Sequence, residues 1–457
     1  MTSLPIGNRI GRCSTFVCAT VWLLLLHCAT ADLRGSCPAA SKRLQLLELV
    51  AEIREIRHIE TANPSAKVCR GLKKPVFERE PQTWQAVPDR KVIVFSAYFE
   101  RRPNADGPSI RIIASGWQSA YNTIGDLYCH LWYDDRDYAV SVGPATYTVI
   151  YPSTLFHEAW SSHFIICRLP KGVAAVPVAV SITPTRCLRQ PGNELMVLNR
   201  KLIKKTDTHA LCISALYNRW SGWEMIIEMF ETHKLLGASE ITIYNYSVSP
   251  ETNRTLRSYI TDKNEAVNVV QWPFPGHLQS NVHCQRGALN DCIYRMGHRH
   301  RYVTITDLDE ILVPRTVNTW PQLMKRVGRP DIGVYMFQHS YFRRNTSTED
   351  PYLITQSSFW TTDEVTPPAK IRCKSMYQAD KAIAIDLHFP YKLVAGAEEY
   401  MMDPAVGMLH HYRPYPMENF AKWPERYRFI EDRYMEKYKN KLIKAFKRRR
   451  ELVRKHP

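Results

Sequence analysis

Between positions 207 and 306 the chain alternates between two hydrophobic patterns, and this alternation limits the folds that it can adopt. Short runs rich in β-branched and aromatic residues are typical of buried strands, and the longer segments between them repeat apolar residues at helical spacing. The expected strands cover 209–215, 240–244, 267–272 and 302–306, and the expected helices cover 223–236, 251–262 and 278–296. Alternating strands and helices predict a mostly parallel α/β sheet with right-handed crossovers.

The last of these strands is followed by three carboxylates, Asp307, Asp309 and Glu310, and then by Pro314. Ligands of open parallel sheets bind outside the carboxyl ends of the strands. Carboxylate oxygens at such an edge suit a hard cation such as Mg²⁺ or Mn²⁺. If the strand continues, Asp307 and Asp309 share one face and Glu310 points to the other. We therefore expect a metal site built from the two aspartates, and the alternative for such a pair is a solvated turn.

Upstream of position 190 the expected elements are short strands separated by Pro, Gly and Asn. They cover 92–99, 110–114, 127–133, 147–151, 162–169 and 176–182, which predicts a small β-sandwich. A helical pattern over 42–60 predicts a stem helix, and 64–88 is expected to be a linker. The expected organisation is a signal peptide or signal anchor at 1–31, a stem and linker at 32–88, a β-sandwich domain at 89–190, the α/β domain at 206–415 and a basic C-terminal helix at 416–457.

The first residues predict entry into the secretory pathway. Arg9 and Arg12 precede an apolar run over 16–26, as in a signal peptide or a short signal anchor. The sequence Ala-Thr-Ala at 29–31 favours cleavage and hence a secreted protein. An uncleaved segment would instead make a single-pass type II protein of the Golgi or ER membrane. Both interpretations place the rest of the chain in the lumen.

The net charge of +17 is concentrated at the C-terminus, where positions 433–457 hold eleven Lys and Arg against two Glu. The remainder is mildly basic, which argues against a nucleic-acid-binding surface through the core. A solvated or membrane-facing tail is the favoured interpretation, and contact with acidic glycans or a partner is the alternative.

The twelve cysteines do not reveal their pairing. Cys284 and Cys292 are too far apart on one expected helix to bond to each other.

Several motifs resemble glycosyltransferase family 92 in their order and spacing. They are Leu216-Tyr217-Asn218, Glu228-Met229-Phe230-Glu231-Thr232-His233 with Leu235-Leu236-Gly237-Ala238, Ile243-Tyr244-Asn245, Gln285 with Leu289-Asn290-Asp291-Cys292, Asp307-Leu308-Asp309-Glu310 and His411-Tyr412-Arg413. Met229 stands where the family usually has Trp, which we interpret as a packing change. The resemblance implies a GT-A fold, Mn²⁺ or Mg²⁺, a UDP-sugar donor and inversion at the anomeric carbon. It also implies transfer of galactose from UDP-galactose to a glycan acceptor, an N-glycan or another glycoconjugate.

The resemblance assigns roles to particular residues. Asp309 and His411 are the expected metal ligands, and Asp307 is expected at the metal or at the donor ribose. The residues expected to cradle the nucleotide are Leu216, Tyr217, Asn218, Tyr244 and Asn245. His388 is the rival metal ligand, and the alternative for His411 is a structural or surface pair with His410.

Two further sets of residues are candidates, one for binding the diphosphate and one for catalysis. Lys370, Arg372 and Lys374 alternate along an extended stretch, so they are expected to face the diphosphate together. The alternative is a charged, exposed edge strand. Inverting transfer needs a general base, usually a carboxylate, and the candidates Asp363, Glu364 and Asp386 lie in the second half of the domain. Glu364 and Asp386 are retained as the expected catalytic residues, and Glu310 is expected to be structural.

Two other classes of protein remain open. One is a catalytically inactive, lectin-like protein that binds glycans through 91–185. The other is a metal-dependent phosphotransferase with Asp307 as nucleophile, which the Glu310-Ile311 sequence disfavours.

Overall fold

The structure, a computed structural model, describes residues 40–118, 124–151, 159–345, 347–362, 372–413 and 429–455. The chain divides into two units, one up to Ala62 and one from Asn63 onward. The described part of the first unit is the helix α2 (Ala40–Ala62), close to the expected stem helix. None of the helices in the described ranges combines the length and the apolar character needed to cross a membrane. The expected signal segment lies outside the described residues.

The second unit begins with a β-rich region that closes on itself. Cys129 in β5 and Cys167 in β8 form a disulfide with their Cα atoms 6.0 Å apart, although four strands lie between β5 and β8 in the sheet order. In a flat sheet the two strands would lie about 24 Å apart, so this sheet must fold back into two layers. Its strands are β1 (Ala66–Cys69), β2 (Gln85–Ala86), β3 (Val92–Glu100), β4 (Ser109–Trp117), β5 (Tyr128–Trp132), β6 (Ala139–Val142), β7 (Thr146–Val149), β8 (Trp160–Arg168), β9 (Ala179–Thr183) and β10 (Leu195–Leu198).

The segment expected to be a linker, 64–88, is instead part of this region. β1 pairs antiparallel with β6, and Cys69 forms a disulfide with Cys187. A four-residue strand is too short for a hydrophobic period to reveal it, which is why the sequence pattern failed there.

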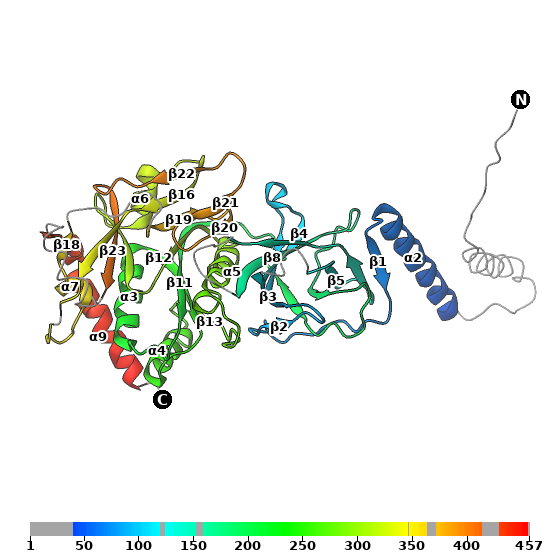
Figure 1. Cartoon of the computed structure of the whole chain (residues 1–457), viewed down its shortest axis with the longest axis horizontal. Coiled ribbons are helices and arrows are strands. Elements are labelled where there is room, and N and C mark those ends of the chain that lie inside the picture. Colours follow the sequence, from blue (N-terminus) through cyan, green and yellow to red (C-terminus); the bar gives the residue numbers. More distant parts are fainter. Residues whose placement is uncertain are drawn as a thin grey trace, which may run out of the picture. The chain divides into compact units, whose positions relative to one another are not determined.

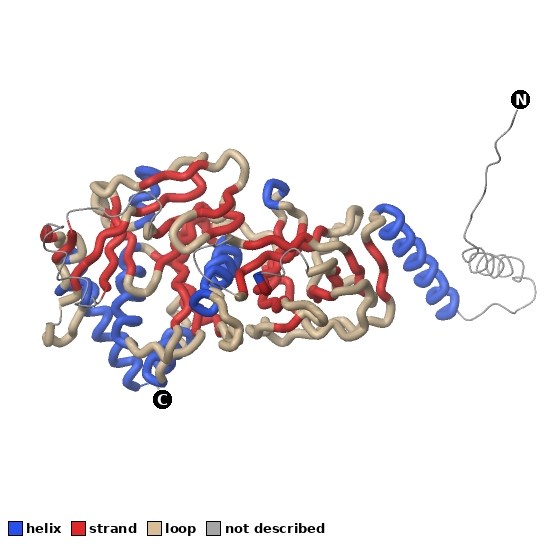
Figure 2. Tube along the Cα trace, in the orientation of Figure 1, coloured by secondary structure: helices blue, strands red, loops and turns tan. Residues whose placement is uncertain are grey.

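The α/β part is confirmed as a mostly parallel sheet with flanking helices (Figures 1 and 2). The strand order is β13-β12-β11-β14-β19-β16-β22, with β19 antiparallel to both of its neighbours. The strands are β11 (Thr206–Leu216), β12 (Ala238–Asn245), β13 (Val267–Gln271), β14 (His300–Thr306), β16 (Ile332–Phe337), β19 (Lys374–Gln378) and β22 (Glu398–Met401). The helices are α3 (Trp223–Leu236), α4 (Pro250–Ile260), α5 (Gln285–Gly297) and α6 (Trp320–Val327).

The sequence pattern predicted the boundaries of α3 but not the start of α5, and the local backbone conformation explains both results. α3 has the predicted bounds and ends at Gly237, whose φ of 104° is the left-handed conformation that glycine tolerates. α5 begins at Gln285, seven residues after the predicted start. Val282, His283 and Cys284 have φ values of 42°, 54° and 63°, which a right-handed helix excludes.

A smaller sheet brings the closing motif beside the acidic turn. β15 (Glu310–Pro314) starts directly after Asp309 and pairs with β23 (Gly407–Arg413), so that Glu310 lies opposite His411. The other strands of this sheet are β17 (His339–Arg343), β18 (Trp360–Thr362) and β24 (Phe429–Glu431). β20 (Ala382–Ile385) and β21 (Pro390–Leu393) form a separate pair.

The C-terminal helix α9 (Lys439–Lys455) packs against α3 (Figure 1). Leu442, Phe446 and Val453 share a small apolar cluster with Ile227 of α3. The basic C-terminal helix predicted at 416–457 is therefore shorter in its described part, since β24 and a 3₁₀ turn (Glu436–Tyr438) precede α9.

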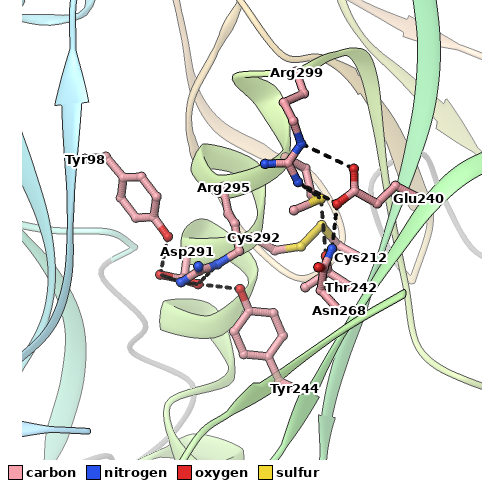
Figure 3. The surroundings of a disulfide bond; sticks show 11 residues. Tyr98, Cys212, Glu240, Thr242, Tyr244, Asn268, Asp291, Cys292, Arg295 and Arg299 are labelled. Carbon is pink, nitrogen blue, oxygen red and sulfur yellow. Dashed lines mark hydrogen bonds and ion pairs between the residues drawn. A yellow bond between two sulfur atoms is a disulfide. The ribbon is translucent and has the colours of Figure 1, made fainter. Parts of the chain in front are cut away.

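One ion-pair network at the amino end of the sheet gives a pH prediction (Figure 3). Glu240 accepts hydrogen bonds from His300, Arg299 and Asn268, at 2.7, 2.5 and 2.6 Å. Although burial opposes it, these partners lower the pKa of Glu240 to about 2. The stabilisation is therefore complete above the usual glutamate pKa and is lost as the pH falls toward 2.

We expect Glu240→Gln to lose about 1–2 kcal/mol of unfolding free energy at pH 7, after allowance for solvent screening. The melting temperatures of the variant and the parent protein should converge as the pH falls from about 4.5 to 2. Parallel melting curves across that range would contradict this account.

Candidate functional site

A cleft of about 800 Å³ opens at the carboxyl edge of the parallel sheet. The end of β11 and the loop after it form one wall, and the turn after β14 and the end of β23 form the other. The lining includes Ser214, Leu216, Tyr217, Asn218, Arg219, Trp220, Val282, Gln285, Asp307, Leu308, Asp309, Arg344, His411 and Arg413. This is the edge where parallel sheets bind their ligands.

The acidic sequence forms a turn, not a continued strand. The Glu310 amide donates to the Asp307 carbonyl at 3.2 Å, and the Asp307 amide donates to a Glu310 carboxylate oxygen at 2.9 Å. The turn brings all three carboxylates to one cluster. The expectation that Glu310 faces away was wrong, because side chains alternate only while the backbone stays extended.

Lys374 compensates the charge at the base of this cluster. Its Nζ lies 2.8 Å from Asp307 Oδ2 and 3.3 Å from Glu310 Oε2, and its side chain is 1% exposed. Burial alone would raise the pKa of Asp307, but Lys374 and neighbouring hydrogen bonds hold it well below its usual range. Burial raises the pKa of Glu310 to about 7 against the pull of Lys374. Lys374 belongs to β19, which lies between β14 and β16 inside the sheet. It is therefore not on an exposed edge strand, the alternative considered for this stretch.

Asp309 and His411 are arranged as two neighbouring ligands of one cation. His411 Nε2 lies 3.3 Å from Asp309 Oδ2, and both residues line the cleft. Adjacent ligands of an octahedral ion at about 2.1 Å are separated by about 3 Å, so the pair fits Mg²⁺ or Mn²⁺. The described residues contain no group of three or more His, Cys, Asp or Glu side chains arranged to hold a metal. A metal here would take its remaining ligands from water and substrate oxygens, as Mg²⁺ commonly does.

The other ring nitrogen of His411, Nδ1, contacts two buried side chains. Nδ1 lies 2.9 Å from His339 Nε2 and 3.4 Å from Glu310 Oε1. When His411 carries its proton on Nδ1, His339 Nε2 and the Glu310 carboxylate can accept it. That tautomer leaves the lone pair of Nε2 free to bind a metal on the Asp309 side.

The residues expected to bind the nucleotide separate into two groups. Leu216, Tyr217 and Asn218 line the cleft. Tyr244 does not, because it points to the other face of the sheet, where its hydroxyl donates to Asp291 at 2.5 Å (Figure 3). Asn245 also lies away from the lining and donates to Gln271 at 3.2 Å.

The remaining candidates lie elsewhere or cannot be placed. Asp386 is buried and paired with Arg286 at 2.5 Å, outside the cleft lining. Arg372 donates to the Tyr341 hydroxyl and does not line the cleft. Glu364 and Lys370 lie outside the described residues.

Neither His388, the rival metal ligand, nor His410, the neighbour of His411, is in the cleft lining. His388 lies beside Cys373, with its Nδ1 3.3 Å from that residue's carbonyl. His410 is fully buried on the opposite face of β23 from His411, stacked on Phe342.

Sequence reasoning assigned no role to the three arginines that line the cleft. Arg219, Arg344 and Arg413 line it, and Arg219 follows Asn218 directly in a turn where both have positive φ values, 51° and 57°. Gln285 was noted only as part of a motif. In the structure its Nε2 lies 3.0 Å from Ser214 Oγ and 3.4 Å from Asp307 Oδ1, so it joins α5 to both walls.

The carboxylate–histidine pair thus lies at the carboxyl edge of an open, mostly parallel sheet, the edge where α/β proteins of this class bind their ligands. The model of glycosyltransferase family 92 matches residues 207–449, more than half of the chain. The chain is therefore a member of glycosyltransferase family 92. A family 92 protein of Caenorhabditis elegans is 20% identical over 219 residues, which cover 43% of this chain and 40% of that protein.

Two solved structures show a distant similarity. One is the mannosyltransferase PcManGT from Pyrobaculum calidifontis in complex with GDP-Man and Mn²⁺, at 12% identity and a TM-score of 0.30, covering 48% of this chain and 60% of that one. The other is glucosyl-3-phosphoglycerate synthase from Mycobacterium tuberculosis with Mn²⁺, UDP-glucose and phosphoglyceric acid, at 12% identity and a TM-score of 0.25, covering 48% of this chain and 77% of that one. The TM-scores are low, so the GT-A-type fold rests on the sheet order and the family.

Proposed function

We propose that this chain is a metal-dependent, inverting glycosyltransferase that transfers galactose from UDP-galactose to a glycan acceptor. The observation that carries the proposal is the 3.3 Å separation of Asp309 Oδ2 and His411 Nε2 in a cleft at the carboxyl edge of the sheet. Membership of family 92 supports it. Mn²⁺ or Mg²⁺ on this pair would supply positive charge for the diphosphate leaving group.

The chain's own residues would bind the donor on both sides of that cation. Tyr217 and Trp220 offer flat surfaces to the uracil base, and both line the cleft. Arg219, Arg344 and Arg413 lie where the diphosphate would extend, and guanidinium groups suit phosphate oxygens. Lys374 keeps Asp307 ionised, so that Asp307 can accept from a ribose hydroxyl or from a water.

The general base would be a carboxylate other than those in the described cleft lining. The carboxylates among the described lining residues are Asp307 and Asp309, which belong to the donor side. Asp386 would have to leave Arg286 to act as a base. Glu364 is therefore the better of the two candidates.

We further propose that the protein works in the lumen of the Golgi or ER, as a single-pass type II membrane protein or as a secreted form. The sequence of the first residues supports this location. Disulfides join Cys69 to Cys187, Cys129 to Cys167 and Cys212 to Cys292, and such bonds persist in oxidising compartments.

The proposal is tested by incubating the purified protein with a panel of UDP-sugars and a glycan array, with Mn²⁺. Transfer from UDP-galactose to one class of glycan is expected. Transfer from a different UDP-sugar would correct the donor. Glycan binding without UDP release from any donor would favour the lectin-like alternative.

A second test concerns His339, which is 1% exposed and supports His411. We expect His339→Leu to weaken Mn²⁺ binding by about 10–100-fold, because the ligand would lose its fixed orientation. His339→Gln, which keeps an acceptor near Nε2, should retain most of the affinity. Titration of Mn²⁺ followed by electron paramagnetic resonance measures both variants. Unchanged binding in the Leu variant would contradict the supporting role.

A further inference from the structure

A second concave surface lies outside the cleft and is strongly basic. A groove of about 670 Å³ is lined by Arg315, Thr316, Val317, Asn318, Gln322, Lys325, Arg326 and Lys437, so that four of its side chains are cations and none is an acid. It shares no lining residue with the candidate active site. The groove therefore favours an anion that is distinct from the donor.

Three of these cations carry uncompensated charge. Arg315 is paired with Asp432, but within the described residues Lys325, Arg326 and Lys437 form no ion pair. Arg326 and Lys437 donate to the carbonyls of Thr316 and Val317 at 3.1 Å, which positions them without neutralising them. Positive charge held in position in a hollow attracts an anionic group.

The basic surface continues from the groove onto α9. Lys437 lies in the 3₁₀ turn directly before that helix. Lys441, Lys444, Arg448 and Lys455 follow at spacings of three, four and seven, so they share one face, and all four are exposed. One exposed acid, Glu451, lies on the same face between Arg448 and Lys455, so the four cations outnumber it. This row of cations is about 21 Å long. No ion pair to any of the four occurs within the described ranges.

Two features indicate which polyanion would bind. A helix that lies on a membrane buries its apolar face in the lipid, but the apolar face of α9 is already packed in the cluster with Ile227. Proteins that bind single-stranded nucleic acids offer aromatic rings for base stacking, and no aromatic residue lines the groove. A charged groove without aromatic lining, continued by a row of exposed cations, suits a flexible chain that carries repeated sulfate or carboxylate groups.

We propose that the groove and the basic face of α9 together form a binding site for a linear acidic glycan, a sulfated or carboxylated polysaccharide. The groove would hold one anionic sugar, and the cations of α9 would follow the chain as it continues. Binding there needs neither donor nor metal. Its failure would therefore leave the proposed transferase activity untouched, and the reverse also holds.

The test is binding of a heparin-derived oligosaccharide to the full chain at physiological salt, by calorimetry, in the presence of chelator. Two variants remove charge from the site: Lys325→Gln with Arg326→Gln in the groove, and Lys441→Gln with Lys444→Gln and Arg448→Gln on α9. The matched control is Lys73→Gln with Lys201→Gln and Lys204→Gln, which removes three exposed cations elsewhere. Melting temperatures establish that each variant is folded.

We expect the parent protein to bind the oligosaccharide, and each site variant to bind about tenfold more weakly, with a reduced salt dependence. The control should bind within about twofold of the parent, and a neutral oligosaccharide of the same length should not bind. The proposal is overturned if the parent does not bind, or if the site variants bind like the control. It is also overturned if phosphatidylserine vesicles or single-stranded DNA bind as tightly through the same residues.

Discussion

Replacing Asp309 by Asn is expected to reduce Mn²⁺-dependent turnover of UDP-sugar by at least about 100-fold while the protein remains folded. Asn keeps the size of the side chain but loses the charge that a hard cation prefers. The Asp309 carboxylate contacts His411 and otherwise faces the cleft, with 27% of the side chain exposed. Its loss therefore removes little packing. Activity and Mn²⁺ affinity should fall together, and the melting temperature should change little.

The matched control for this variant is Asp207→Asn. Asp207 lies at the opposite end of β11, is 74% exposed and pairs with Arg301 at 3.3 Å. Exposed pairs of this kind contribute at most about 1 kcal/mol, so activity and stability should be nearly unchanged. Equal activity in the two variants would rule out Asp309 as a metal ligand.

Replacing Asp291 by Ala is expected to cost about 3–5 kcal/mol of unfolding free energy, because it leaves buried partners without their acceptor. Asp291 is 0% exposed. It accepts from Tyr98 of β3 at 2.6 Å, from Tyr244 of β12 at 2.5 Å and from Arg295 at 3.1 Å (Figure 3). It also accepts from Ser96 of β3. One carboxylate on α5 thus joins the β-rich region to the parallel sheet.

The variants Tyr98→Phe and Tyr244→Phe provide the comparison. Each removes one hydroxyl and leaves the charge pair of Asp291 and Arg295 intact, so each should cost about 1 kcal/mol. Thermal and urea unfolding measure all three variants. If Asp291→Ala were no more destabilising than either tyrosine variant, the carboxylate would not be the centre of this junction.

The regular elements of the α/β part could be predicted because their signals are local. The bounds of α3 follow from helical spacing and from Gly237, and β11, β12 and β14 follow from apolar runs. The start of α5 could not be predicted, since the sequence around Val282 carries no glycine to mark its left-handed backbone. β1 was not predicted because it is defined by its pairing with β6, a strand far away in the sequence, and not by a local pattern.

The same distinction applies to the candidate site, where features with a local sequence signal could be predicted and features set by tertiary contacts could not. Asp307 and Asp309 directly follow a strand in the sequence, and this local pattern was enough to predict that they lie at the carboxyl edge of the sheet. The role of Glu310 depends on a turn that returns it to Lys374 and His411, and the position of Tyr244 depends on which face of β12 meets α5. Both are set by contacts between residues far apart in the chain, which a single sequence does not show.

The most direct measurement of the central claim is UDP release from UDP-galactose by the parent protein, with Mn²⁺ and with chelator. The claim that Asp309 and His411 hold a metal for sugar-nucleotide chemistry predicts release with Mn²⁺ that chelator abolishes and added Mn²⁺ restores. Release that continues at the same rate in chelator would contradict it.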